Sequence, residues 1–538
     1  MQMIAFGKSH PTPALCCSPC SSTLSGLLTR TCTPPGGSIG AGLFVGSGSA
    51  LQSGGPASLV ICYLIIGAML LFTCQALAEL AVVYPVNGAF YTYVVRFVDP
   101  SWGFAMGWDY AITWLTVLPF ELTAASLTIQ FWRTDINVGV WVTVFLVVLA
   151  VIQIFGVRGY GEVEFVLSII KIIACIGFII FGIVVDCGGT KKTAVNDDYK
   201  KYMGAHYWHD PGAFRNGFYG FCSVFVTAAF AFSGTELVGL AAAESANPRK
   251  SIPLATKQVF WRVLFFYVVN LFIVGLIVKS SDTRLLGASG ANTKASPFVF
   301  AIQDAGVKGL PSVMNAVITI AVISVANSCT FGSTRTMQAL AERGMAPRFL
   351  AHVDKHGRPI WAVVIQIAFG LLAFIGEAEN QSTVFNWLLS LSGLSYFFVW
   401  GSICLAHIRF RAAWKAQGYS LDLIPYRPSL GVLGSWIGLF INCMCLLATF
   451  YTALYSALHP TSGAHRDVGA FFQSYLAAPI VIVLFFGWKL YSHNWRLYVP
   501  LLEMDLRSGA RLLTPEEAAL APKRTWKSLP YRLLRSLF

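Results

Sequence analysis

Apolar stretches long enough to cross a bilayer as helices, about 20 residues each, recur along almost the whole of the 538-residue chain. We therefore predict an all-α polytopic membrane protein with about twelve transmembrane helices, of which the first and the ninth have the weakest apolar pattern. The predicted spans are Ser38–Gly55, Ala57–Val82, Trp102–Gln130, Val138–Phe155, Val163–Val185, Gly217–Ala243, Gln258–Val278, Leu310–Phe331, Trp361–Ile375, Val384–Ile408, Val432–Leu458 and Phe471–Tyr491.

The loops between these spans are short, apart from residues 186–216, 279–309 and 332–359. Residues 296–307 have helical periodicity, and we predict an outer surface helix that leads into the eighth span. Residues 333–344 predict an amphipathic cytoplasmic helix after that span. None of the loops is long enough to fold as a soluble domain.

Composition supports the membrane class. Only 12% of the residues are charged and 56% are apolar, and the mean hydropathy is +0.63, whereas about a quarter of the residues of a soluble domain are charged. The net charge of +13 does not indicate a nucleic-acid partner, because no loop carries a basic stripe interleaved with aromatic residues.

The distribution of Lys and Arg predicts the orientation. An even number of spans places both termini on one side, and cytoplasmic segments are richer in Lys and Arg. The tail from Lys489 to Arg535 supplies most of the difference between the two sides. We therefore predict that both termini are cytoplasmic and that residues 492–538 form a cytoplasmic tail.

Few ionisable residues fall deep inside the spans. Lys171 lies near the middle of the fifth span, where an ammonium is costly unless it faces a polar interior or a partner. Asp109 lies near the end of the third span and suggests a structural role. Glu121 and Glu236 lie deeper; Glu121 fits either a proton carrier or a neutral carboxyl that hydrogen-bonds to a neighbouring helix. For Lys171 a working group is favoured, and a structural ion pair between helices is the alternative.

Glycine and hydroxyl residues interrupt the first and the sixth span, as GGSIGAGLFVGSG (residues 36–48) and FSGTE (residues 232–236). Glycine weakens a helix, so we predict that both helices break here. Broken backbone exposes amide donors and carbonyl acceptors, which suit a zwitterion. The two spans are five apart, as expected for two inverted five-helix repeats. Glycines also serve close helix packing, which is the alternative.

Several long segments resemble the fungal amino acid permeases of the amino acid–polyamine–organocation superfamily. They occur in the family's order between Gly37 and about Arg511, and include QALAELAVVYPVNGAFYTYVVRFVDPSWGFAMGW, FAFSGTELVGLAAAESANPRKSIP and NSCTFGSTRTMQALAERGMAP. The resemblance implies two inverted five-helix repeats plus two extra helices, with residues 38–491 as the transporter domain. It also implies import of amino acids coupled to protons across the plasma membrane.

The resemblance implies roles for particular residues. The amides of the broken first helix would receive the substrate carboxylate; these residues are Ser38, Ile39, Gly40, Ala41 and Gly42. The broken sixth helix would receive the substrate amine through carbonyls, with Phe232 as a lid and Glu236 bracing the break; its other residues are Ser233, Gly234 and Thr235. Lys171 matches a lysine that replaces the ion of sodium-coupled relatives. Asn386 and Trp387 fall near the pocket, where packing is an equal alternative.

The segment 1–37 departs from the family pattern, which runs without interruption from QMIA to GSIG. Here 29 residues, Lys8 to Gly36, separate the two parts. Gly7-Lys8-Ser9 can be encoded with an intron start (GGTAAGTC) and Pro35-Gly36 with an intron end (CCAGG), so we predict a retained intron. A metal site is the weaker alternative, formed by Cys16, Cys17, Cys20 and Cys32. The family's long N-terminal tail is also missing, and we expect the true start upstream.

Three functional classes compete. A secondary transporter fits best, and we expect an amino acid substrate, protons and the lipid bilayer as partners, with no cofactor. An amino acid sensor would use the same pocket with little net transport, but such sensors in this family carry long soluble tails. An intramembrane enzyme would need a constellation of reactive side chains inside the spans. The clustered histidines lie instead in loops, at His206, His209, His352 and His356.

Overall fold

A computed structural model describes residues 39–86, 88–190, 192–240, 247–285, 296–355, 357–377, 381–459, 467–514 and 516–517. The side chains at 89, 156–159, 238, 240, 376–377 and 381–386 are not described. The predicted intron at 8–36 and its four cysteines, Ser38, His356 and the tail beyond 517 therefore lie outside the described residues. Every regular element in the described ranges is a helix, as predicted.

The α-helices are α2 (Ala41–Phe44), α3 (Gly46–Val83), α4 (Ala89–Phe97), α5 (Pro100–Ile129), α6 (Val138–Ile154), α7 (Gly156–Asp186), α8 (Gly217–Ala231), α9 (Leu237–Leu240), α10 (Pro248–Arg262), α11 (Asn270–Ile277), α12 (Pro297–Asp304), α13 (Leu310–Glu342), α14 (Ile360–Gly370), α15 (Gln381–Ala416), α16 (Val432–Leu458), α17 (Val468–Tyr475) and α18 (Ala477–Ser492). Short helices with other hydrogen-bond patterns include η3 (Val263–Val269), which joins α10 to α11, and η7 (Leu371–Glu377), which follows α14.

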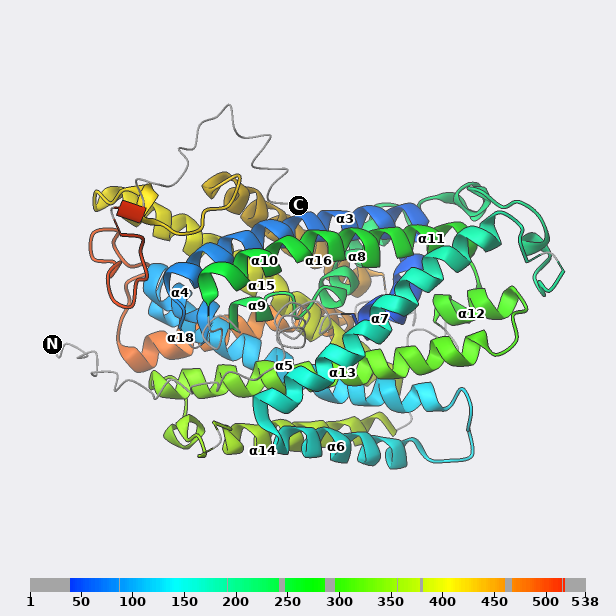
Figure 1. Cartoon of the computed structure of the whole chain (residues 1–538), viewed down its shortest axis with the longest axis horizontal. Coiled ribbons are helices and arrows are strands. Elements are labelled where there is room, and N and C mark those ends of the chain that lie inside the picture. The colour runs from blue at the N-terminus through cyan, green and yellow to red at the C-terminus, as the bar shows by residue number, and fades with distance from the viewer. Residues whose placement is uncertain are drawn as a thin grey trace.

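The long helices run roughly along the longest axis of the molecule (Figure 1). Helices α5 and α13 pack closely together in the middle of the bundle, and α3 packs against α8. Helices α6 and α14 lie together along one edge. We refer to the two ends of the bundle as the α4 end and the α12 end, after the helices that lie there in Figure 1.

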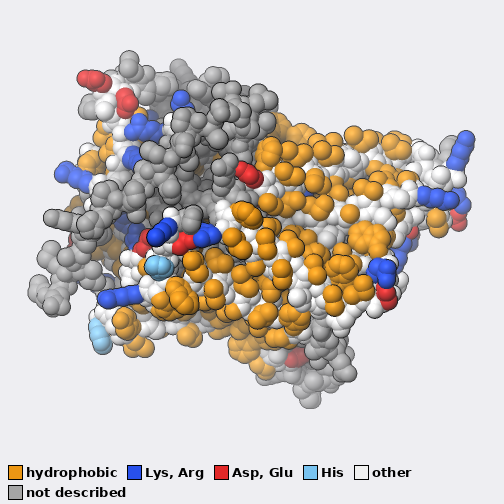
Figure 2. Space-filling model, turned by 60° about the horizontal axis from the view of Figure 1, so that its bottom comes forward, with side chains coloured by type: hydrophobic (Ala, Val, Ile, Leu, Met, Phe, Trp, Pro, Cys, Tyr) orange, Lys and Arg blue, Asp and Glu red, His pale blue; other side chains and the backbone are white. Residues whose placement is uncertain are grey.

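The outer surface of the bundle is apolar. Figure 2 shows hydrophobic side chains gathered in a band across the middle of one face, with most Lys, Arg, Asp and Glu at the two ends. Large exposed side chains follow the outer faces of α6 and α7; they include Val147, Val151, Ile169, Ile173 and Ile180. A membrane protein presents such a band to lipid tails, because the hydrocarbon core holds no water that could hydrogen-bond to polar side chains.

In the described part of the chain, seven helices are long and apolar enough to cross a membrane, and the pair α17 and α18, bent by 69°, adds an eighth. Three shorter apolar helices occupy the predicted fourth, sixth and ninth spans: Val138–Ile154, Gly217–Ala231 and Ile360–Ile375. The polytopic, all-α class is confirmed. The count of twelve spans in two inverted repeats stays a prediction.

Local sequence explains where α5 begins. Asp99 is the N-cap, and its Oδ1 accepts hydrogen bonds from the backbone N–H groups of Ser101 and Trp102, both at 2.9 Å. Pro100 occupies the first helical position, where its missing N–H costs nothing. The ammonium of Lys489 on α18 lies 2.9 Å from Asp99 Oδ2. This buried pair therefore ties the last span to the start of the third.

The structure corrects one prediction about a connecting helix and bears out another. The predicted outer surface helix at 296–307 is present as α12, but the side chains from Pro297 to Ile302 are buried. Ser296 Oγ donates to the Phe44 carbonyl at 2.7 Å, and Phe298 packs edge-on against Phe44. Helix α12 therefore inserts into the bundle. The predicted helix at 333–344 is present, as the last part of α13, which continues unbroken from Leu310 to Glu342.

Candidate substrate and coupling site

In the first predicted span, the described helix begins within the glycine cluster. Gly40 has extended backbone (φ −149°, ψ −149°), and α2 follows it for one turn. Helix α3 then begins at Gly46 and bends again at Gly55, which has φ +82°. The predicted first and second spans thus form α2 and α3, with a sharp kink at Gly55. Of the segment predicted to be unwound, Ile39 and Gly40 lie outside helix, whereas Ala41 and Gly42 are helical, and Ser38 lies outside the described residues.

The sixth helix breaks at the predicted position. Helix α8 ends at Ala231, and Gly234 has φ +83°, a conformation that favours glycine. Helix resumes at Leu237, whose N–H donates to the Gly234 carbonyl at 3.3 Å. The segment from Phe232 to Glu236 therefore carries backbone groups without the regular hydrogen bonds of a helix.

Glu236 closes this break from inside. Its carboxylate accepts hydrogen bonds from Tyr110 Oη at 3.1 Å, from Trp400 Nε1 at 3.2 Å and from the Gly234 N–H at 3.3 Å. The side chain is fully buried. One carboxylate thus joins the broken segment to α5 and α15, which is the geometry expected of a group that braces the break.

The two breaks lie against each other. A Cβ added to Gly42 would come within 2.5 Å of Ala231 Cα, so α2 touches the backbone at the end of α8. Tyr63 Oη donates to the Gly42 carbonyl at 3.4 Å, and Tyr267 Oη donates to the Ala231 carbonyl at 2.9 Å. Two tyrosines therefore hydrogen-bond to carbonyls at the facing ends of the broken helices.

Phe232, the predicted lid, is fully buried between these tyrosines. Its ring centroid lies 5.7 Å from that of Tyr63 and 4.3 Å from that of Tyr267. Next to it, Thr235 Oγ1 donates to the Phe232 carbonyl at 2.8 Å and receives a hydrogen bond from Arg262. Arg262 is buried, although its position at the end of the seventh predicted span suggested an interfacial residue.

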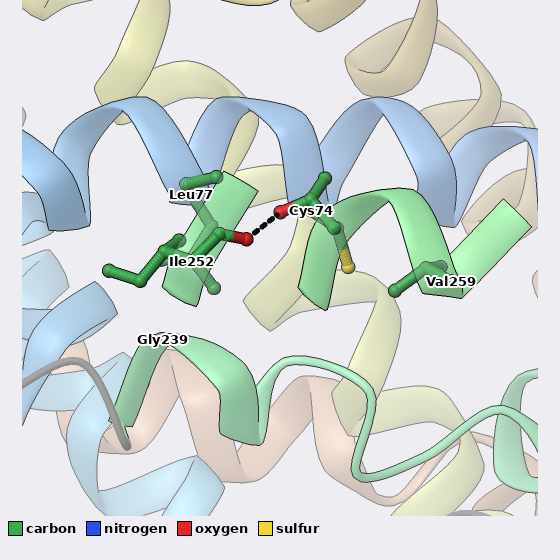
Figure 3. A pocket seen from close by; sticks show the side chains of 7 residues that line it. Cys74, Leu77, Gly239, Ile252 and Val259 are labelled. Atoms are coloured by element: carbon green, nitrogen blue, oxygen red, sulfur yellow. Dashed lines mark hydrogen bonds between the residues drawn. The ribbon is translucent and has the colours of Figure 1, made fainter. Parts of the chain in front are cut away.

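A small cavity lies beside the second break, between α3, α9 and α10 (Figure 3). It has room for about one water molecule. Its wall is mostly apolar, and the hydroxyl of Thr256 points away from solvent to the Ile252 carbonyl at 3.0 Å. The cavity is too small for an amino acid, and its lining residues are Cys74, Leu77, Ala78, Gly239, Ile252, Thr256 and Val259.

Lys171 lies buried on α7, as predicted, and its ammonium has two described partners. It donates to Ser324 Oγ at 2.6 Å and to Glu164 Oε1 at 3.4 Å. The Ser324 hydroxyl lies 2.7 Å from both oxygens of the Glu164 carboxylate. Ser328, one helical turn further along α13, lies instead 3.3 Å from Tyr160 Oη.

Glu121 faces the first break from α5. A Cβ built on Gly40 would lie 3.7 Å from Glu121 Oε1. Glu121 Oε2 is buried and has no hydrogen-bond partner among the described residues. This carboxyl lies within electrostatic reach of Lys171. Glu121 therefore joins the first break to the coupling group proposed from the sequence.

Asp109 and the tenth-span residues lie apart from the breaks. Asp109 accepts a hydrogen bond from Ser395 Oγ at 2.9 Å, which links α5 to α15. Trp387 is half-buried, and the side chain of Asn386 is not described. Neither Asn386 nor Trp387 has a described contact that assigns it to the site.

Sequence reasoning missed several residues of this region, above all Glu164. It stands seven residues before Lys171, two helical turns away and so on the same face of one helix. That spacing was the available signal. Glu79 was missed as well; it forms a buried ion pair with Arg411 at 2.7 Å, and His407 Nε2 lies 3.2 Å from it. The contacts of Tyr63, Tyr110, Tyr267 and Trp400 with the breaks had no signal in the sequence.

Comparison with known proteins agrees with this architecture. A manganese transporter from Eremococcus coleocola has a similar fold, with a TM-score of 0.52 and 14% identity over 88% of this chain and 96% of its own. At that identity the likeness concerns the fold alone.

Closer relatives are fungal transporters. The general amino-acid permease GAP2 of Candida albicans is 51% identical, over 89% of this chain and 79% of its own length. The cationic amino acid transporter 1 of Schizosaccharomyces pombe is 48% identical, over 92% and 83%. The general amino-acid permease GAP1 of Saccharomyces cerevisiae is 47% identical, over 91% and 82%. The profile of the amino acid permease family matches residues 35–500, and the chain belongs to this family, among the fungal permeases of the amino acid–polyamine–organocation superfamily.

Proposed function

We propose that this permease imports amino acids across the plasma membrane by proton symport with alternating access, and that both its termini are cytoplasmic. The observation that carries the proposal is the contact between Gly42, at the start of α2, and Ala231, where α8 ends before the second break. Backbone groups freed by a break inside a bundle are shielded from water. They can therefore bind a polar ligand strongly.

The chemistry of the breaks suits the common part of every amino acid. Amides from Ser38 to Gly42 would hold the carboxylate, because a helix start carries partial positive charge. Carbonyls from Phe232 to Thr235 would hold the ammonium, with Phe232 closing over it. Glu236 keeps the second break open by accepting the Gly234 N–H. The backbone groups of the two breaks would not contact the substrate side chain. The shape of the surrounding pocket would therefore select among amino acids.

Proton coupling rests on the ionisable groups that flank the first break. Lys171 lies deep between α7 and α13, and Glu121 approaches Gly40 from α5. A fixed ammonium at this place removes the need for a metal cation. Its protonation can follow the arrangement of the helices around it, because an uncompensated charge inside the membrane is costly. Rocking of the bundle about the breaks would then move amino acid and proton together.

The test is uptake in cells that lack their own amino acid permeases. A panel of radiolabelled neutral and cationic amino acids is used, since the relatives are named as general and cationic transporters. We expect concentrative uptake that rises as external pH falls and is unchanged when choline replaces sodium. Sodium-dependent uptake would contradict symport with protons. A protein at the cell surface that triggers a nutrient response with little uptake would instead favour the sensor.

A further inference from the structure

Lys171, Ser324 and Glu164 form one continuous hydrogen-bonded chain. The lysine ammonium donates to Ser324 Oγ at 2.6 Å. A hydroxyl has a single hydrogen, and that hydrogen is left to point to Glu164, whose two oxygens both lie 2.7 Å away. Ser324 therefore bridges the cation and the anion, and it does so between α7 and α13.

All three side chains are fully buried, so their charges must balance locally. The direct contact between Lys171 Nζ and Glu164 Oε1 is 3.4 Å, and neither side chain has any exposed surface. Removing one partner of a buried pair leaves an uncompensated charge. The pair is neutral as a whole, and one added proton gives it a charge of +1.

Other titratable groups act on this pair from the surrounding helices. Cys175 lies on the same helix, α7, and Glu121 faces Lys171 from α5. The described group that meets the pair from α13 is the Ser324 hydroxyl, which does not titrate in this range. Ser168 lies 3.5 Å from Glu164 Oε1, but its hydroxyl is directed to the Glu164 backbone carbonyl at 2.6 Å. Glu164 is thus the acid in direct contact with Lys171.

We propose that Glu164 is the second half of the proton-coupling site, so that Lys171 and Glu164 bind and release the transported proton as one unit through Ser324. This inference rests on the proposed proton symport and adds a residue to it. One proton from the outer side converts the neutral pair to a cation, and its release on the inner side restores the pair. No bond other than that to the proton forms or breaks. Interacting groups at this distance titrate together, so the proton belongs to the pair.

The bridge gives the unit a mechanical consequence. While the pair is neutral, Ser324 ties α13 to α7 through two hydrogen bonds. A proton on Glu164 removes one acceptor oxygen from this network. The contact between the two helices therefore weakens when the proton binds, which links protonation to movement around the first break.

Glu164→Gln tests the proposal, with Glu162→Gln as the matched control, because Glu162 lies half a turn away on the same helix and is exposed. In proteoliposomes, we expect Glu164→Gln to retain measurable substrate exchange but to lose pH-driven accumulation by at least about tenfold. Its uptake should also lose its dependence on pH. Glu162→Gln should behave like the wild type. A Glu164→Gln protein that still accumulates substrate with the wild-type pH profile would overturn the proposal.

A double variant covers the case in which Glu164→Gln does not fold. Lys171→Met with Glu164→Gln removes both charges of the pair, so neither is left without its partner. We expect it to reach the membrane, exchange substrate and fail to accumulate it along a proton gradient. Accumulation by the double variant would show that the pair is only structural. If the wild type itself does not accumulate substrate along a proton gradient, that result contradicts the proposed symport. The variants test only the function of Glu164 within it.

Discussion

The hydroxyl of Tyr267 donates to the Ala231 carbonyl at 2.9 Å, at the point where α8 ends. The break that follows Ala231 leaves this carbonyl without its helical partner, and both residues are buried. A side chain from η3 thus supplies the hydrogen bond that the backbone lacks. The break is stable because a neighbouring helix compensates for it.

Tyr267→Phe should destabilise the protein by about 1–3 kcal/mol, because a buried carbonyl is left without a donor. The measurement is thermal unfolding of the purified protein in detergent. Tyr451→Phe is the control, since Tyr451 lies on the outer face of α16 and is 37% exposed. Equal unfolding temperatures for the wild type and Tyr267→Phe would contradict this function of the hydroxyl.

Gly42→Leu and Gly234→Leu should each abolish amino acid uptake. A Cβ on Gly42 would already come within 2.5 Å of Ala231 Cα, and Gly234 has φ +83°, which costs other residues roughly 1–2 kcal/mol. The change at Gly42 would push α2 away from the end of α8, and the change at Gly234 would strain the backbone of the second break.

The glycine variants are compared with Gly177→Leu on α7, where an added Cβ meets nothing within 4 Å. Uptake is normalised to surface abundance, measured by labelling intact cells. We expect all three proteins at the surface and normal uptake only for Gly177→Leu. Transport by Gly42→Leu or Gly234→Leu would remove that break from the substrate site.

Lys171→Met should keep substrate exchange and lose concentrative, pH-driven uptake. The substitution removes the charge that pairs with Glu164 and the donor to Ser324. Preloaded vesicles measure exchange, and a proton gradient imposed on empty vesicles measures accumulation. A Lys171→Met protein that still concentrates substrate would show that the ammonium only stabilises the fold and does not couple transport to protons.

Asp505→Asn should loosen the segment that follows α18. Arg96 Nη2 lies 3.1 Å from Asp505 Oδ2, and Arg96 also donates to the Ser508 carbonyl at 2.8 Å. Burial acts to raise the pKa of Asp505, but hydrogen bonds from Ser508 and Arg507 and the charge of Arg96 outweigh it and lower this pKa to about 2.

Because this pKa is depressed, the Asp505 carboxylate stabilises the packing of the segment after α18 at every pH above the ordinary value of about 4. The contribution is lost as pH falls through about 2. Limited proteolysis at neutral pH measures how firmly the segment after α18 packs on the bundle. We expect faster cleavage after Trp495 in Asp505→Asn. The partly exposed pair is screened by solvent, so the change in rate should be severalfold at most. An unchanged rate would show that backbone hydrogen bonds suffice.

Mature transcripts should lack the codons from Lys8 to Gly36. Without them the segment QMIAFG runs directly into GSIGAGLF and the first-helix motif is complete. Sequencing of cDNA across this junction decides the question. Retention in most transcripts, or abundant peptides from Cys16 to Arg30 in membrane fractions, would refute the intron.

The sequence alone determined the class of the protein, the positions of its long apolar helices and the break in the sixth predicted span. These features are local: an apolar run is long enough for a membrane or it is not, and a cluster such as Ser233, Gly234 and Thr235 weakens helix wherever it occurs. The deep position of Lys171 was visible for the same reason, since one charge in an apolar stretch stands out.

Only the tertiary structure decided which groups meet. Glu164 stood at the start of a predicted span and looked interfacial, yet packing of α7 against α13 places it beside Lys171 and Ser324. Arg262 likewise lies buried against the second break. Hydropathy reports the free energy of placing one helix in the bilayer. The partner of a buried charge depends instead on which faces of distant helices come together. Helix α12 is apolar enough for either place, and contact with Phe44 buries it inside the bundle.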